Sequence, residues 1–329
     1  MDELKPSSIF TEKSQKPSQN KQGEEDSKSW MEVYMDKKNR IETLVYQVLD
    51  TYDFKILNDQ EFKMVMKNKK ILTNIIKSFH LPAFNQDTIV HLNEALTIRV
   101  NAKDIKLDVH VRDDSGTRYN VEAQIDTSKF GYKRHLFYLT SVFVDQLETA
   151  GDYEKLRPVA SAVIYQSKVQ PKVIVSAKME GDLLEDEGDF LYMYSISASK
   201  WKQATDPWLR IFLAFVKLGL KLSDEEYNRH GLDTSSEIFR EIKEGIYFAV
   251  MDYTIQYKEE LGVDEEMEKS IGDILIEQGK IEGKIEGKIE TLFIDLKLSI
   301  EEIVEKLSVP AKYVEEVIDK LNLHLNKMQ

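Results

Sequence analysis

Two carboxylates and an amide occur on segments in which apolar and polar residues alternate. The first segment contains Asp108, and the second, a short turn later, contains Glu122 and Gln124. Successive side chains of a β-strand point to opposite faces, so the polar residues of each segment share one face. Carboxylate oxygens are ligands that Mg²⁺ prefers, and a metal-bound water can attack a phosphate ester. These residue types therefore suit metal-dependent hydrolysis.

The turn between the two segments decides whether the carboxylates meet. Residues 114–116, Asp-Ser-Gly, predict a three-residue hairpin loop with glycine in the left-handed conformation. This loop places Asp108 opposite Glu122, and Lys106 opposite Gln124, where its ammonium could offset the acids. Like charges on directly opposed residues are destabilising unless a cation compensates them. A four-residue loop would put the two acids on opposite faces, and polar residues of an alternating strand can also form only its solvated face.

The spacing of apolar residues along the chain predicts an α/β fold. A period of three to four residues predicts helices at 31–52, 62–79, 130–147, 208–220 and 238–257. A period of two, or a β-branched run, predicts strands at 92–100, 105–111, 119–125, 159–165 and 173–175. Helices thus precede and follow the strands that carry the acids.

Composition divides the chain into three parts. Residues 1–30 contain few apolar side chains and are expected to form a disordered tail. Residues 31–255 are expected to form the main domain, and residues 256–329 a helical tail. Within that tail, residues 279–290 repeat Gly-Lys-Ile-Glu three times, and a short helix pair follows, beginning at Ser299. The isoleucines of the repeat fall on one helical stripe, which favours packing or a homo-oligomer through these helices.

The net charge of −13 is concentrated at the C-terminal end of the chain. Lys221–Gln329 holds 26 acidic and 14 basic residues, which leaves the preceding part close to neutral. A DNA backbone could therefore approach that part but would be repelled by the C-terminal third. The chain has no cysteine and no apolar run of about 18 residues, so we expect a cytoplasmic protein that does not enter membranes.

Several short motifs resemble one protein family. Asp108 in Leu-Asp-Val, followed by Val-Glu-Ala-Gln at 121–124, resembles the core of the PD-(D/E)XK nuclease superfamily. More narrowly, the chain resembles the Rpn family of recombination-promoting nucleases, also called PD-(D/E)XK nuclease family transposases. Tyr-Asp-Phe-Lys at 52–55, Tyr-Lys-Arg at 132–134 and Gly-Asp-Tyr at 151–153 resemble further elements of that family, as do the Gly-Lys-Ile-Glu repeats.

The resemblance implies a restriction-endonuclease-like mixed sheet flanked by helices, with an α-helical C-terminal tail. It implies that Asp108, Glu122 and the backbone carbonyl of Ala123 bind a divalent ion, Mg²⁺ or Mn²⁺. Gln124 stands where the superfamily more often has lysine, and would position water or phosphate rather than supply charge. Glu94 lies where many members have an additional acid.

The same resemblance implies DNA as the partner and nucleic-acid hydrolysis as the activity. Lys129, Lys133 and Arg134, at the start of the following helix, would contact DNA phosphates, although such residues can also be ordinary exposed charges. The function expected is a metal-dependent DNA endonuclease associated with recombination or mobile elements. The alternative is an inactive nuclease-fold protein that acts as an interaction or oligomerisation module through its acidic tail, which the neutral Gln124 would permit.

Overall fold

The computed structural model of the chain describes residues 30–79, 90–92, 97–100, 103–113, 115–125, 131–147, 153–178, 190–307, 314–315, 317–318 and 321. The chain divides into two compact units, Met1–Thr43 and Leu44–Gln329. Helix α2 (Trp30–Thr51) runs from the first into the second, and all other described elements belong to the second. The predicted disordered tail at 1–30 lies outside the described residues, apart from the first residue of α2.

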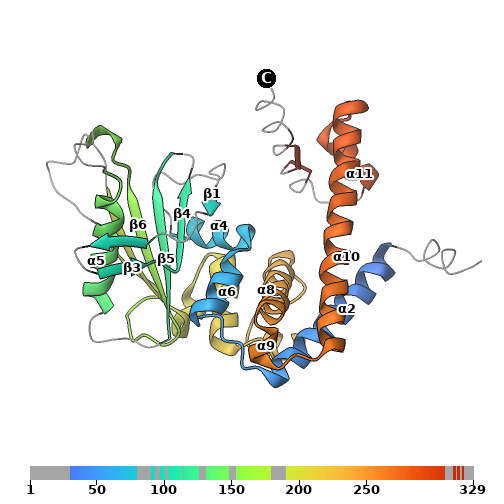
Figure 1. The fold of residues 1–329 in the computed structure, drawn as a ribbon, viewed down its shortest axis with the longest axis horizontal. Coiled ribbons are helices and arrows are strands. Elements are labelled where there is room, and N and C mark those ends of the chain that lie inside the picture. The colour runs from blue at the N-terminus through green and yellow to red at the C-terminus, as the bar shows by residue number, and fades with distance from the viewer. Residues whose placement is uncertain are drawn as a thin grey trace, which may run out of the picture. The chain divides into compact units, whose positions relative to one another are not determined.

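A six-stranded mixed sheet forms the centre of the second unit (Figure 1). In spatial order its strands are β1 (Val90–Leu92), β4 (Val109–Asp113), β5 (Arg118–Gln124), β6 (Val159–Tyr165), β8 (Leu191–Ser197) and β7 (Ile174–Lys178). The β5/β6 and β6/β8 pairs are parallel and the other pairs antiparallel. Every residue of β6 is buried, as is typical of a parallel strand covered on both faces.

Helix α5 (Gly131–Val144) covers one face of this sheet. Its Leu139 and Val142 form an apolar cluster with Val159 of β6, and Met193 of β8 packs against the cluster. The side chain of the next residue, Tyr194, points to the opposite face, where the ring of Phe79 stacks on it at 5.1 Å. Helices therefore cover both faces, which confirms the predicted mixed α/β sheet flanked by helices.

The described helices outside α5 pack mainly with one another. Their bounds are α3 (Asp59–Met66), α4 (Lys69–Lys77), α6 (Pro207–Leu218), α7 (Asp224–Arg229) and α8 (Glu237–Gln256), with 3₁₀ turns η1 (Tyr153–Lys155) and η3 (Ala198–Gln203). The helix predicted at 62–79 is in fact two helices, α3 and α4. Asn68 separates them because its side chain accepts hydrogen bonds from the backbone N–H of Lys70 and Ile71, both at 3.1 Å, and so caps α4.

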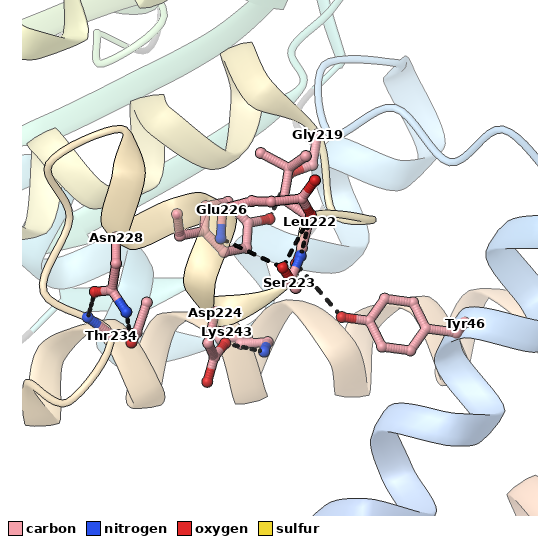
Figure 2. A network of polar contacts seen from close by, with 10 residues as sticks. Tyr46, Gly219, Leu222, Ser223, Asp224, Glu226, Asn228, Thr234 and Lys243 are labelled. Carbon is pink, nitrogen blue, oxygen red and sulfur yellow. Dashed lines mark hydrogen bonds and ion pairs between the residues drawn. The ribbon is translucent and has the colours of Figure 1, made fainter.

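Polar contacts fix the junction of α6, α7 and α8 (Figure 2). Ser223 and Glu226 form a reciprocal capping box at the start of α7, with hydrogen bonds of 2.8 and 3.3 Å between side chains and backbone N–H groups. The buried Lys243 of α8 donates to Asp224 at 2.8 Å, and Tyr46 of α2 donates to a backbone carbonyl before α7 at 3.4 Å. These contacts hold α7 between its neighbouring helices.

The hairpin between β4 and β5 has the predicted register. His110 pairs with Asn120, and the Asp113 N–H donates to the Thr117 carbonyl at 3.1 Å, as a three-residue loop requires. Gly116 has a φ of +87°, a conformation that glycine adopts without a steric penalty. The predicted loop length and register are therefore confirmed for the β4/β5 ladder, which ends at the pair Val109–Val121, one residue before Asp108.

The strand predicted at 105–111 is interrupted at Asp108. Residues before it form β3 (Lys103–Lys106), which pairs with β2 (Thr97–Val100) in a separate two-stranded sheet, and β4 begins only at Val109. Lys106 pairs with Thr97, so the predicted pairing of Lys106 with Gln124 is wrong. The cause is that the chain changes sheets between the two strands, which requires a bend at Asp108.

The C-terminal part of the described chain is helical, as predicted. It consists of α9 (Lys258–Leu261), α10 (Glu265–Glu290), a π-helical turn η4 (Thr291–Asp295) and α11 (Ile300–Leu307). Ile289, from the Gly-Lys-Ile-Glu repeat, joins Leu292 and Ile303 in a separate apolar cluster. Ser299, where the helix pair was predicted to begin, caps α11 through hydrogen bonds with Glu302. Among the described helices, none is both long enough and apolar enough to span a membrane.

Candidate functional site

Two backbone N–H groups hold the carboxylates of Asp108 and Glu122 close to each other. Asp108 Oδ2 accepts from the backbone N–H of Ala123 at 3.1 Å, and Glu122 Oε1 accepts from the backbone N–H of Asp108 at 3.3 Å. The Glu122 carboxylate thus accepts from the N–H of Asp108 itself, and the Asp108 carboxylate accepts from the N–H of the residue that follows Glu122. The β4/β5 ladder ends at the pair Val109–Val121, and Asp108 lies in a bend just before β4. From this position its carboxylate can accept a hydrogen bond from the N–H of Ala123, which lies beyond the end of the ladder.

Burial makes this pair of acids electrostatically unfavourable when both are charged. Glu122 is only 2% exposed, and burial raises the pKa of its carboxyl to about 7, with a further contribution from the Asp108 charge. Burial also raises the pKa of Asp108, against the hydrogen bond from Ala123, which lowers it. Two carboxylates in a poorly solvated site favour a proton or a cation between them.

The donor set fits a hard divalent cation. Among the described residues, no three His, Cys, Asp or Glu side chains are grouped so that they could hold a metal. A divalent ion at Asp108 and Glu122 would therefore need further oxygen ligands from the backbone or from water. Mg²⁺ is commonly held by one or two carboxylates and keeps several waters. Ala123 follows Glu122 in β5, and its N–H already donates to Asp108 Oδ2.

A small cleft opens beside Glu122. Strand β5 contributes Glu122 and Gln124, α5 contributes Arg134, His135 and Tyr138, and β6 contributes Val163 and Tyr165. Gln124 is partly buried and lies next to Glu122 along the cleft wall, as predicted from the alternation of β5. The structure therefore places Glu122 and Gln124 on one wall of the cleft, and Asp108, which does not line it, is tied to this wall by its hydrogen bond from Ala123.

The predicted basic residues take different positions. Arg134 Nη2 lies 3.7 Å from Glu122 Oε2, and its guanidinium lies over the ring of Tyr138 at 5.3 Å from the centroid. Lys133 is exposed on the same turn of α5 and does not line the cleft. Two further predicted residues, Lys129 and Glu94, lie outside the described residues.

Sequence reasoning missed a lysine at the edge of this cleft. Lys168, in the loop after β6, has its ammonium 4.1 Å from the ring centroid of Tyr165 and 4.2 Å from that of Tyr132, and it donates to Ser195 Oγ at 2.8 Å. Nothing in the sequence around Lys168 indicates this position. It follows from the parallel pairing of β5 with β6, which aligns Gln124 with Tyr165.

The first turn of α3 also reaches the site. The charge of Asp59 raises the pKa of Asp108, and that of Lys63 lowers it. Asp59 and Lys63 form an ion pair of 2.6 Å one helical turn apart. Neither residue was a sequence candidate, because helix spacing alone does not show which face of α3 approaches the hairpin.

The two histidines near the acids are buried and neutral at neutral pH. His135 Nε2 lies 2.9 Å from the carbonyl of Ser161, and burial lowers its pKa to about 4. Burial and the nearby arginines likewise lower the pKa of His110 to about 4. His110 lies in the β4/β5 ladder and is 7% exposed.

A family model described as PD-(D/E)XK nuclease family transposase matches residues 52–273, about two thirds of the chain. The matched region contains the hairpin with both acids, the α5 helix and the loop that carries Lys168. No curated protein and no solved structure matches the chain.

Proposed function

Because the chain belongs to the PD-(D/E)XK nuclease family transposases, we propose that it is a metal-dependent DNA endonuclease that acts in recombination or on mobile elements. Its mixed α/β sheet fits the restriction-endonuclease-like fold of that family. The observation that carries the proposal is that backbone hydrogen bonds hold the partly buried carboxylate of Asp108 next to the buried carboxylate of Glu122, which lines a cleft.

In this proposal Asp108 and Glu122 bind Mg²⁺ or Mn²⁺, with the backbone carbonyl of Ala123 as a further ligand. Their raised pKa values support it, because a divalent ion offsets the repulsion that otherwise keeps a proton on the pair. When bound, such an ion lowers the pKa of a coordinated water and offsets charge on a phosphate. Gln124 accepts or donates a hydrogen bond that orients the attacking water or a phosphate oxygen.

The reaction is hydrolysis of one phosphodiester. Water adds to phosphorus, one phosphorus–oxygen ester bond breaks, and the released oxygen takes up a proton. Glu94, if it reaches the acids, would add to the same set, and Lys129, Lys133 and Arg134 would bind the DNA backbone. Such phosphate contacts contribute affinity without sequence preference and weaken as salt increases.

The proposed domain organisation assigns residues 31–255 to the nuclease and residues 256–329 to a helical tail. The apolar cluster of Ile289, Leu292 and Ile303 supports a tail with its own packing. The tail could also join two copies of the chain, which sedimentation of the full chain and of a chain ending before residue 279 would test.

The test of the nuclease proposal is plasmid cleavage by the purified chain in Mg²⁺ and in Mn²⁺. Asp108→Ala should abolish cleavage and weaken metal binding measured by calorimetry, while DNA binding persists. Asp50→Ala is the matched control, because Asp50 is exposed and its ion pair with Lys221 lies at the surface. Cleavage by Asp108→Ala at the wild-type rate would exclude the catalytic assignment, and a wild type without metal binding or cleavage would favour the inactive interaction module.

A further inference from the structure

The acids and the amide leave the reacting centre without a fixed positive charge. Hydrolysis of a phosphodiester adds negative charge to the phosphate oxygens in the transition state, beside the carboxylates of Asp108 and Glu122. Preorganised positive groups at such a position account for a large part of enzymatic rate enhancement. Gln124, as a neutral amide, cannot supply this charge.

Arg134 is placed to supply it. Its guanidinium lies in the first turn of α5 and lines the same cleft as Gln124 and Glu122. Its side chain is 45% exposed, whereas that of Glu122 is 3% exposed, so the arginine extends from the buried acid toward the open side of the cleft. Of the two described basic residues that line the cleft, Arg134 carries the charge, because burial lowers the pKa of His135 to about 4.

The contact with Glu122 leaves hydrogen-bonding capacity on Arg134. The 3.7 Å separation of Nη2 and Oε2 exceeds hydrogen-bond length, so the pair is electrostatic rather than a bidentate fork. A guanidinium has five N–H donors in one plane, which match the oxygens of a phosphate. The ring of Tyr138, one turn further along α5, lies 5.3 Å from the guanidinium carbon and attracts its charge.

We propose that Arg134 is a catalytic residue that contacts the reacting phosphate and supplies the positive charge that Gln124 lacks. The inference rests on the nuclease function proposed above and deepens it. It distinguishes Arg134 from Lys133, whose exposed position fits contact with DNA phosphates away from the reacting one.

The activity test compares Arg134→Gln, Arg134→Lys and the double variant Gln124→Lys/Arg134→Gln with the wild type. The control is Arg240→Gln, the same change at an exposed position of α8. In single-turnover cleavage at saturating DNA, Arg134→Gln should lower the rate by about 10²-fold or more, the usual effect of removing one electrostatic group. Arg134→Lys should cut at a rate between those of the wild type and Arg134→Gln. The double variant should cut at least about tenfold faster than Arg134→Gln, because a lysine at position 124 restores the positive charge.

Metal binding gives a readout that does not depend on cleavage. Without DNA, the guanidinium opposes a cation near Glu122, so Arg134→Gln should tighten Mn²⁺ binding by about threefold or more in calorimetry, while Arg240→Gln leaves it unchanged. An Arg134→Gln protein that cuts within about threefold of the wild type at saturating DNA overturns the inference alone. A wild type that cuts no DNA overturns the nuclease proposal and the inference with it.

Discussion

Glu122 should make the metal-free protein less stable at neutral and alkaline pH than at mildly acidic pH. Its carboxyl is 2% exposed, and burial together with the Asp108 charge raises its pKa from 4.5 to about 7. Replacing it by glutamine keeps an oxygen that can accept the hydrogen bond from the Asp108 N–H, while removing the titration. Glu122→Gln is therefore expected to stabilise the metal-free chain.

The sign follows from proton binding. Between pH 4.5 and about 7 the folded state keeps the proton that the unfolded state has released, so the free energy of unfolding falls as pH rises through this window. Each unit of difference between the folded and unfolded pKa values changes the free energy of unfolding by about 1.4 kcal/mol. The rise of the Glu122 pKa from 4.5 to about 7 therefore corresponds to ~3 kcal/mol. Below pH 4.5 both states are protonated, and the contribution vanishes.

The buried histidines act in the opposite direction. The pKa values of His110 and His135 fall from 6.5 to about 4, so the unfolded state binds more protons in that range and the protein loses stability as pH falls through it. This effect is common to the wild type and the variant. It cancels when the free energy of unfolding of the wild type is subtracted from that of Glu122→Gln at each pH.

The assay is denaturant unfolding in a chelator from about pH 5 to about pH 8, with Glu259→Gln, at an exposed site, as the matched control. The free energy of unfolding of Glu122→Gln minus that of the wild type should rise by ~2 to 3 kcal/mol over this pH range. The same difference for the control should not change with pH. If this difference for Glu122→Gln did not change with pH, the claim that the buried Glu122 carboxyl has a raised pKa would be wrong. Adding Mg²⁺ should then stabilise the wild type more than the variant, since an ion that binds only the folded state stabilises it.

Two further predictions concern residues around the acids. Lys168→Ala should weaken DNA binding and reduce the slope of log affinity against log salt by about one, measured by fluorescence anisotropy, because it removes one positive charge beside the cleft residue Tyr165. An unchanged slope would place Lys168 outside the DNA path. Gly116→Ala should lower the free energy of unfolding by ~1 to 2 kcal/mol, because φ is +87° and the new Cβ would lie 3.1 Å from Arg157 Cγ. Full stability of that variant would contradict the turn geometry.

The hairpin was predictable because local rules determine it. Alternation shows which residues share a face, and a three-residue loop ending in glycine sets the register that brings Asp108 to Glu122. Both rules act within about 20 residues of sequence, where turn geometry leaves few alternatives. The same holds for the strand 159–165 and for the cap at Ser299, which depend on a β-branched run and on one side chain.

The remaining parts depend on contacts between distant segments. The break at Asp108 arises because the chain leaves one sheet and enters another, which alternation across 105–111 does not reveal. Strand β8 was missed because Leu191–Ser197 mixes serine and tyrosine with apolar residues and follows an acidic run. It becomes a strand through its parallel pairing with β6.

The positions of the positively charged side chains also depend on contacts between distant segments, whereas those of the acids follow from local sequence. A strand pattern identifies acids, because their partners lie across one hairpin, but the position of a cation depends on where α5 and the loop after β6 cross the sheet. Lys133 and Arg134 are adjacent in sequence, yet only Arg134 lies beside Glu122. Since a helix turns about 100° per residue, neighbouring basic residues cannot both face the cleft, and the one that does is set by the packing of Leu139 and Val142 on the sheet. The charge that Gln124 lacks on β5 can therefore come from α5 without any change in the strand motif.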